Sequence, residues 1–276
     1  MPKIINYLYD PGLSNYALDF LESSKMRSYE AAEYGLRLNT IMGNEYFMDQ
    51  IANHTSELGC HETVALPRVA APVLAEQLAE LNQRRRSHRN YAPTGLTLAE
   101  VGQLLRLAYV VTDATNLERG LPPTRNIASG GGLYPIDLYY VNRRTQGLRP
   151  GVYHYHVANE TLERLPGLED SVALEEQLNA AFFADQQADM DYPNASGYLV
   201  LGGVLNRVCF KYQDRGLRFA LVDAGAITHS IYLASAALGI GCCGMGSYSD
   251  DLANKLIGFR GTAQQVLGVV VIGKSA

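Results

Sequence analysis

The chain has few of the features that mark a metal site, a membrane protein or a nucleic-acid-binding protein. Its four cysteines show no zinc or redox spacing, and the adjacent Cys242 and Cys243 are poorly placed for a mutual disulfide. The longest apolar run, residues 219–245, contains Asp223 and His229, so it fits a buried helix better than a membrane span. The first residues lack a signal-peptide core, and a net charge of -5 argues against a nucleic-acid surface. We therefore expect a cytoplasmic protein with small, buried, reduced cysteines.

Composition and periodicity indicate an α+β protein with an appendage. Hydrophobic residues make up 47% of the 276 positions and charged residues 18%, which suffices for a full core. We expect a helical N-terminal extension over 1–65, with helical periodicity over 14–58 and an extended stretch at 62–68, and one domain over 66–276. Further helices are predicted at 72–83, 97–108, 169–183, 216–238 and 250–256. Strands are predicted at 136–141, 197–205 and 265–272, with a hairpin over 151–165 that turns at Ala158 and Asn159, and a loop over 112–135.

Three familiar patterns predict no site. Residues 239–244 match the GxGxxG dinucleotide pattern but follow a long helix, whereas that motif leaves a strand and opens a helix. Residues 268–275 match the Walker A pattern, but their interior reads as a β-strand. His154 and His156 share one face of a predicted strand, and two histidines are too few for a zinc site.

Three other segments carry donors suited to a phosphorylated, planar ligand. The first is an arginine cluster in which a serine hydroxyl adds a neutral donor: Arg85, Arg86, Ser87 and Arg89. The second, residues 129–135, has three successive glycines that let backbone amides approach a flat ring. The third, residues 244–247, offers glycine-flanked amides after the long helix. Taken singly, these segments also fit a solvated basic patch, a flexible turn and an ordinary helix end.

A lysine beside a tyrosine, Lys211 and Tyr212, lies between an apolar strand and a nearly uncharged helix. Burial there would favour the neutral amine of the lysine, which could then act as a base. The alternative is a surface lysine beside an amphipathic ring. The pair gains weight because the arginine cluster and the glycine segment precede it in a recognisable order.

In this order the segments resemble the FMN-dependent nitroreductase superfamily, and within it the SagB-type azoline dehydrogenases, over about residues 66–272. The Lys-Tyr pair and the SGGGLYP element are the more specific parts of the resemblance. It implies a nitroreductase-like α+β fold with a mixed central sheet flanked by helices, and FMN at a homodimer interface built largely from the helix at 216–238. The residues that it implies for FMN binding are Arg85, Arg86, Ser87, Arg89, Ser129, Gly130, Gly131, Met245, Gly246 and Lys274.

The resemblance also implies an enzyme that oxidises peptide-borne thiazoline or oxazoline rings to thiazoles or oxazoles in natural-product peptide biosynthesis. Lys211 would be the base, Tyr212 would orient the substrate or share the proton, and oxygen would reoxidise the reduced flavin. Two alternatives remain open: an NAD(P)H:acceptor oxidoreductase in which the pair is structural, and a scaffold subunit of a complex with a cyclodehydratase. A carrier-bound azoline would fit the same sequence. No metal, nucleic acid or membrane is expected as a partner.

Overall fold

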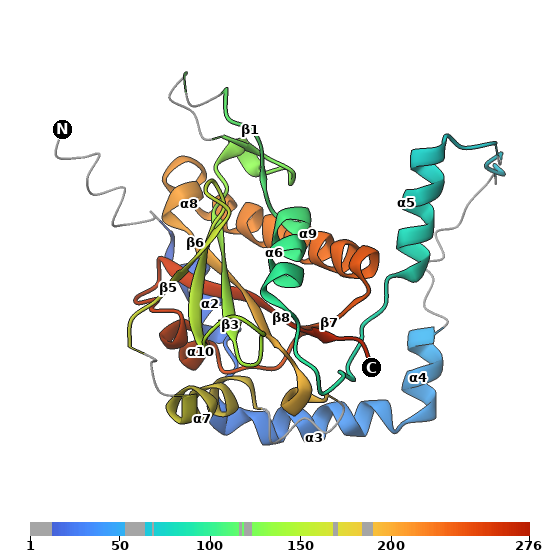
Figure 1. Ribbon diagram of the computed structural model, residues 1–276. Coiled ribbons are helices and arrows are strands. Elements are labelled where there is room, and N and C mark those ends of the chain that lie inside the picture. The colour runs from blue at the N-terminus through green and yellow to red at the C-terminus, as the bar shows by residue number, and fades with distance from the viewer. Residues whose placement is uncertain are drawn as a thin grey trace.

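A six-stranded sheet forms the centre of the fold (Figure 1). The computed structural model describes residues 13–52, 64–67, 69–115, 118, 123–167, 171–183 and 190–276. In the order β5-β4-β3-β6-β8-β7, the strands are Thr161–Arg164, Gly151–His156, Ile136–Asn142, Gly197–Val204, Gln264–Lys274 and Ile240–Met245. Every pairing among these strands is antiparallel, so the described sheet is antiparallel where a mixed sheet was expected.

Helices bury both faces of the sheet. The first core contains α6 (Leu98–Ala108), α8 (Asn206–Tyr212) and α9 (Asp214–Leu238), and the second contains α7 (Ser171–Phe182) and α10 (Asp250–Leu256). Strand β6 alternates between them, because Leu199 belongs to the first core and Tyr198 and Val200 to the second. A strand covered on both faces needs apolar side chains at almost every position, which explains its continuous apolar run.

The N-terminal extension consists of short elements rather than one helix. They are α2 (Asn15–Ser23), η1 (Ser28–Glu30), α3 (Ala31–Met42) and α4 (Glu45–Ala52). Ala17 and Leu21 of α2 join the first core, whereas α3 buries no side chain. In Figure 1, α3 runs along the lower edge of the domain, and α5 (Val73–Arg84) stands away from the sheet. The part of the predicted helix beyond residue 52 lies outside the described residues; the extended stretch has no regular structure at 64–67.

Most predicted elements are confirmed within a few residues, including the capping box at Thr97 and the hairpin turn between β4 and β5. Two elements were missed: α8, and strand β7 in the glycine-rich segment that follows α9. The Tyr91 ring lies so close to Gly273 of β8 that a Cβ there would lie 2.6 Å from it, and Gly241 of β7 is similarly crowded. Glycine in these strands therefore makes room for an aromatic ring.

Two further segments differ in detail from the sequence prediction. The predicted loop at 112–135 contains a short antiparallel pairing of β1 (Val111–Asp113) with β2 (Thr124–Arg125), and a 3-10 turn, η3 (Gly130–Gly132). A second 3-10 turn, η4 (Tyr192–Asn194), precedes β6. Gly239 ends α9 in the left-handed conformation and β7 follows, so the GxGxxG match runs from helix to strand, as its rejection required.

Helix α9 is long and apolar enough to cross a membrane by length and composition. In this fold it is a core helix that packs against α6, α8 and β7. Its burial within one copy of the chain is nevertheless incomplete. Val222 is 67% exposed and Leu221 41%, and the exposed positions continue along the helix at Arg218, Gly225 and His229.

Candidate functional site

A tyrosine of α9 joins two of the predicted segments. The Tyr232 hydroxyl lies 3.2 Å from Ser87 Oγ and accepts a hydrogen bond of 2.7 Å from the Gly244 N–H. The Arg85 guanidinium lies over the same ring, 5.5 Å from its centroid. The arginine cluster and the glycine-flanked end of β7, which are far apart in the sequence, therefore meet at the C-terminal end of α9. We call this group the arginine end.

The backbone of the arginine cluster is tied to the edge of the sheet. The His88 N–H donates to the Cys242 carbonyl at 2.8 Å, and the Ala92 N–H donates to the Lys274 carbonyl at 2.9 Å. The buried Tyr91 hydroxyl closes the segment by donating to the His88 carbonyl at 2.9 Å. The side chains of Arg86, Ser87 and Arg89 remain exposed on this fixed backbone.

The other predicted segments meet near the N-terminal end of α9. Gly131 has a φ of 68°, and a Cβ on it would lie 2.5 Å from Tyr212 Oη, so this position requires glycine. The Tyr212 ring packs edge-on against Phe219 with centroids 5.0 Å apart, and Phe219 lies against Gly130. The glycine segment and the Lys-Tyr pair thus form one packed group, which we call the glycine end.

Asp223 of α9 holds the glycine segment in place. Its side chain accepts hydrogen bonds from the Ser129 hydroxyl and the Gly130 N–H, and the residue is 4% exposed. Burial raises the pKa of this carboxyl above its ordinary value, and the two hydrogen bonds oppose that shift. Asp223 was first noted only as a charge that interrupts an apolar run. No local sequence pattern marks it as the partner of the glycine segment, because only the fold brings the two together.

Of the two environments considered for Lys211, one copy of the chain shows the exposed one. The lysine lies in the last turn of α8, where it is exposed, and its Nζ is 5.1 Å from the centroid of the Tyr212 ring. Gln213 follows with φ 48° and ψ −135°, a conformation that is uncommon for a residue other than glycine, and it turns the chain from α8 into α9. Within the described part of this chain, an apolar enclosure for the lysine is therefore missing.

The arginine end and the glycine end lie apart along α9. Asp223 and Tyr232 are nine positions apart, or about 13 Å along a helix. One copy of the described chain therefore brings Arg85 and Ser87 to Gly244 but not to the glycine segment. Lys274, predicted as a phosphate ligand, lies with its Nζ 3.4 Å from Glu100 Oε1.

A cavity of about 590 Å³ adjoins the arginine end. Arg89, Met245 and Gly246, all three predicted to bind the cofactor, line it together with part of α3. A Cβ at Gly246 would meet no atom within 4 Å, so its backbone faces open space. The volume lies within the range of about 300–1,000 Å³ that small-molecule sites occupy.

The described residues contain no group of three His, Cys, Asp or Glu side chains that could hold a metal ion. His154 and His156 share one face of β4, and His154 Nδ1 lies 3.1 Å from Glu163 Oε2. Cys209, Cys242 and Cys243 are buried and unpaired, as expected, and Cys60 lies outside the described residues.

The Nitroreductase family matches residues 83–274 of the chain. A protein of Methanocaldococcus jannaschii that is named as a nitroreductase is 29% identical over 181 residues, which cover 66% of this chain and 84% of that protein. The microcin B17-processing protein McbC of Escherichia coli is 24% identical over 164 residues, which cover 58% of this chain and 56% of McbC.

Solved structures give the same fold. The E. coli microcin synthetase McbBCD complex with truncated pro-MccB17 bound contains a chain that matches with a TM-score of 0.66 at 19% identity, covering 84% of this chain and 82% of that one. A Ralstonia eutropha protein named as a nitroreductase matches with a TM-score of 0.57 at 20% identity, covering 78% and 88%. The predicted α+β architecture, a sheet flanked by helices, is confirmed.

Proposed function

The chain belongs to the nitroreductase family, and from that premise we propose that it is an FMN-dependent dehydrogenase that oxidises peptide-borne thiazoline or oxazoline rings to azoles. The observation that carries the proposal is the packing of Tyr212 against Gly131, because it joins the two sequence elements most specific to SagB-type dehydrogenases. The similarity to McbC, a microcin-processing protein, supports the same substrate class.

The residues of the arginine end fit the phosphate of FMN. Arg85, Arg86 and Arg89 offer charged donors and Ser87 a neutral one, in a segment that His88 and Ala92 tie to the sheet. Gly246 leaves backbone exposed beside the adjoining cavity, where a planar ring can approach. Lys274 is the weakest of the proposed ligands, because Glu100 already pairs with it.

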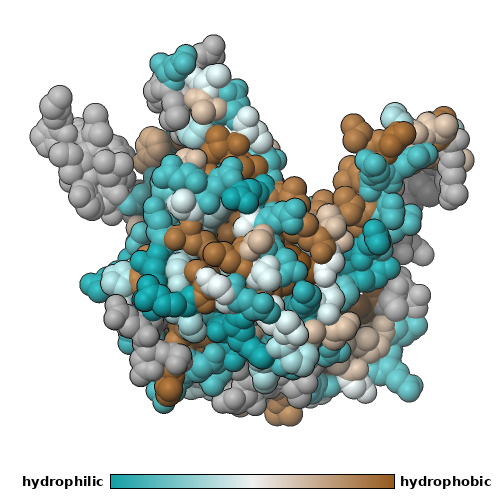
Figure 2. Space-filling model, in the orientation of Figure 1, coloured by the Kyte–Doolittle hydropathy of each residue, from teal (hydrophilic) through white to brown (hydrophobic). Residues whose placement is uncertain are grey.

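A second copy of the chain would complete the site. The middle of the exposed stripe of α9 is apolar or small, with Leu221, Val222 and Gly225, so a homodimer can form along it. If the two α9 helices pack antiparallel, the glycine end of one copy approaches the arginine end of the other. Apolar side chains of α5, among them Val73 and Leu74, are also exposed. Figure 2 shows brown surface at the upper right, where Figure 1 places α5.

In this reaction, Lys211 removes the proton from the ring carbon next to the peptide carbonyl, which acidifies that C–H bond together with the C=N bond. Tyr212 orients the ring or shares the proton, and enclosure of the exposed Lys211 by the second copy would favour its neutral form. Bound FMN would accept the hydride that leaves the neighbouring ring carbon and pass the electrons to oxygen. The ring gains one C=C bond and becomes aromatic.

A second function is favoured by the M. jannaschii relative, whose name gives it as a nitroreductase. In that function the chain reduces an acceptor with NAD(P)H, and Lys211 and Tyr212 are structural. The structural match comes from a microcin synthetase complex, which instead supports a place for this chain, as a dehydrogenase or a scaffold subunit, in a peptide-modifying complex.

The experiment that tests the proposal uses the purified chain and a synthetic thiazoline peptide under air. We expect a yellow protein that releases FMN on heating and removes two hydrogen atoms from the peptide, as followed by mass spectrometry. A protein that stays colourless after incubation with FMN contradicts the cofactor assignment. A flavin that NADPH bleaches rapidly, while the thiazoline stays unchanged, establishes the reductase instead.

A further inference from the structure

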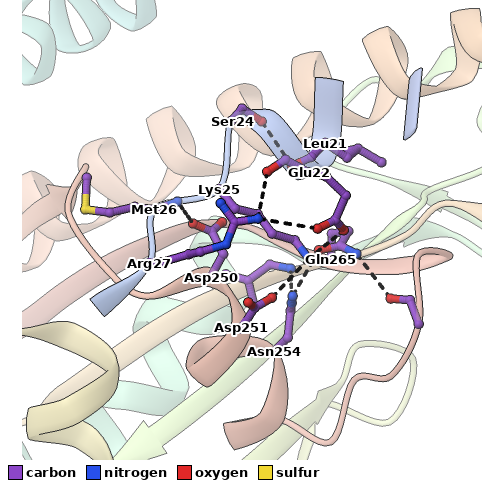
Figure 3. Close-up of polar contacts among 12 residues, drawn as sticks. Leu21, Glu22, Ser24, Lys25, Met26, Arg27, Asp250, Asp251, Asn254 and Gln265 are labelled. Carbon is purple, nitrogen blue, oxygen red and sulfur yellow. Dashed lines mark hydrogen bonds and ion pairs between the residues drawn. The ribbon is translucent and has the colours of Figure 1, made fainter. Parts of the chain in front are cut away.

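The N-terminal extension is clamped to the domain next to the cavity. The Met26 N–H donates to Asp250 Oδ2 at 2.8 Å, and the Asp250 N–H donates back to the Met26 carbonyl at 3.1 Å (Figure 3). Lys25 adds ion pairs to Glu22 at 2.7 Å and to Asp251 at 3.0 Å, with only 11% of its side chain exposed. The chain leaves this clamp and enters α3 within a few residues, so the clamp fixes where α3 begins.

Helix α3 presents an apolar line to the cavity rather than to the core. Tyr34, Leu38 and Met42, one turn apart, line the cavity, yet no side chain of α3 is buried. The same cavity is lined by Phe183, by Met190 of the second core and by Met245 of β7. An apolar face that the described chain leaves uncovered, beside residues proposed to bind FMN, is suited to an apolar group of a bound substrate.

We propose that α3 forms one wall of the substrate site and selects the apolar group that flanks the azoline ring. This inference rests on the proposed function, because that function supplies the ring. The cavity also contains one cation, Arg89, and two amides or hydroxyls, Asn39 and Ser247. Because Arg89 is assigned to the FMN phosphate, the ring and its carboxamide would lie toward Asn39 and Ser247. The apolar group would lie against Tyr34 and Leu38.

Gly35 gives the sharpest test of this wall. It lies among the α3 residues that line the cavity, and a Cβ built on it would meet nothing within 4 Å. Gly35→Leu therefore fills the cavity while it improves helix propensity. Gly35→Ala separates the effect on the helix from the effect of volume, and Ala32→Leu adds similar bulk on the same helix outside the cavity lining.

The probes are two thiazole carboxamides, the products of the proposed reaction, that carry either a methyl or a phenyl group on the ring. Their binding to the flavin-loaded protein is measured by isothermal titration calorimetry, which requires no turnover. We expect Gly35→Leu to weaken binding of the phenyl probe roughly tenfold or more, because the leucine side chain occupies the space that the phenyl group needs. The affinity for the methyl probe should change little. Gly35→Ala and Ala32→Leu should bind both probes as the unmodified chain does.

Several outcomes would overturn the inference. If Gly35→Leu weakens both probes equally, α3 does not select the apolar group. If Gly35→Leu lowers the affinity for FMN, the cavity holds the cofactor. If it weakens the dimer, a second copy covers α3. If Gly35→Leu fails to fold, Leu38→Ala serves instead, because it enlarges the cavity beside α3. It should tighten binding of a naphthyl probe relative to the phenyl probe. Unchanged relative binding of the two probes would also overturn the inference. Selective binding without azoline oxidation removes the proposed reaction but leaves the wall in place.

Discussion

The two ends of α9 are built in different ways. At the glycine end, Tyr212 and Phe219 fill the space beside the glycines, and Asp223 binds their backbone. At the arginine end, Arg85 lies over the Tyr232 ring, while the side chains of Arg86 and Arg89 are exposed. A closed group is suited to shape and orientation, whereas an open donor set is suited to capturing an anion. In the proposed homodimer, each end would supply what the other lacks.

The largest expected effect comes from separating the two copies. Val222→Glu places a charge in the middle of the exposed stripe of α9, where a dimer would bury it without a partner, so we expect the dimer and the bound FMN to be lost together. Sedimentation of the flavin-loaded protein measures this. Val172→Glu, at an exposed position of α7, is the control and should remain a yellow dimer. A Val222→Glu protein that is a flavin-loaded dimer would show that the stripe is not the interface.

The next effect concerns the arginine end alone. Arg85→Ala combined with Arg89→Ala should weaken FMN binding by roughly 10²–10⁴-fold, because each charge-assisted contact is worth about 1.5–3 kcal/mol. Arg84→Ala is a matched control, since Arg84 is well exposed and pairs with Glu80 at 3.5 Å. Fluorescence titration with FMN checks both. If the double variant and the control bind FMN equally, the cluster is only a solvated patch.

Lys211→Ala tests the glycine end without touching the anion donors. We expect FMN and the dimer to be retained and azoline oxidation to fall by about 10²–10⁴-fold, the usual contribution of a positioned proton transfer. Lys255→Ala, at an exposed lysine of α10, should keep the rate. A Lys211→Ala enzyme with the rate of the unmodified chain would assign the pair a structural role and favour the NAD(P)H-linked reaction.

Tyr232→Phe should produce a smaller change at the arginine end. It removes the hydroxyl that Ser87 and Gly244 share, which costs about 1–3 kcal/mol for two neutral hydrogen bonds. Because Ser87 then loses its support, FMN should bind roughly tenfold more weakly, while Tyr16→Phe on α2 should have no effect. Urea unfolding and FMN titration measure the two quantities. Unchanged affinity with lowered stability would restrict Tyr232 to the fold.

The smallest expected effect is a pH dependence at the glycine end. The raised pKa of Asp223 means that the folded chain binds more protons than the unfolded chain above the ordinary value of 3.8. Relative to Asp223→Asn, the unmodified chain should therefore lose stability as the pH rises from 3.8 through the raised pKa, and the difference should then level off. Urea unfolding across this pH range tests the slope. Parallel stability curves would mean that burial does not control this carboxyl.

The sequence predicted the pieces of the site better than their arrangement. Residue types revealed the arginine cluster, the glycine segment and the Lys-Tyr pair, because each has a local pattern. Tyr232 and Asp223, which hold these pieces, have no local pattern, and only the fold brings them to their partners. Strand β7 was missed for a related reason: its glycines resemble a turn until Tyr91 is seen to require the space. The burial that a base at Lys211 would need is missing in one copy because α8 ends at the surface.

The hydrogen bonds that tie residues 88–92 to the sheet have a consequence for ligand capture. Fixing one residue's backbone costs about 1–2 kcal/mol of conformational entropy. Because the Tyr91 hydroxyl and the bonds to β7 and β8 order this segment when the chain folds, the cost is incurred on folding and not on ligand binding. An anion that arrives afterwards meets donors whose backbone is already ordered, so little of its binding free energy is spent on arranging them. The segment is preorganised, and a substitution at Tyr91 would weaken anion binding without removing a single contact to the anion.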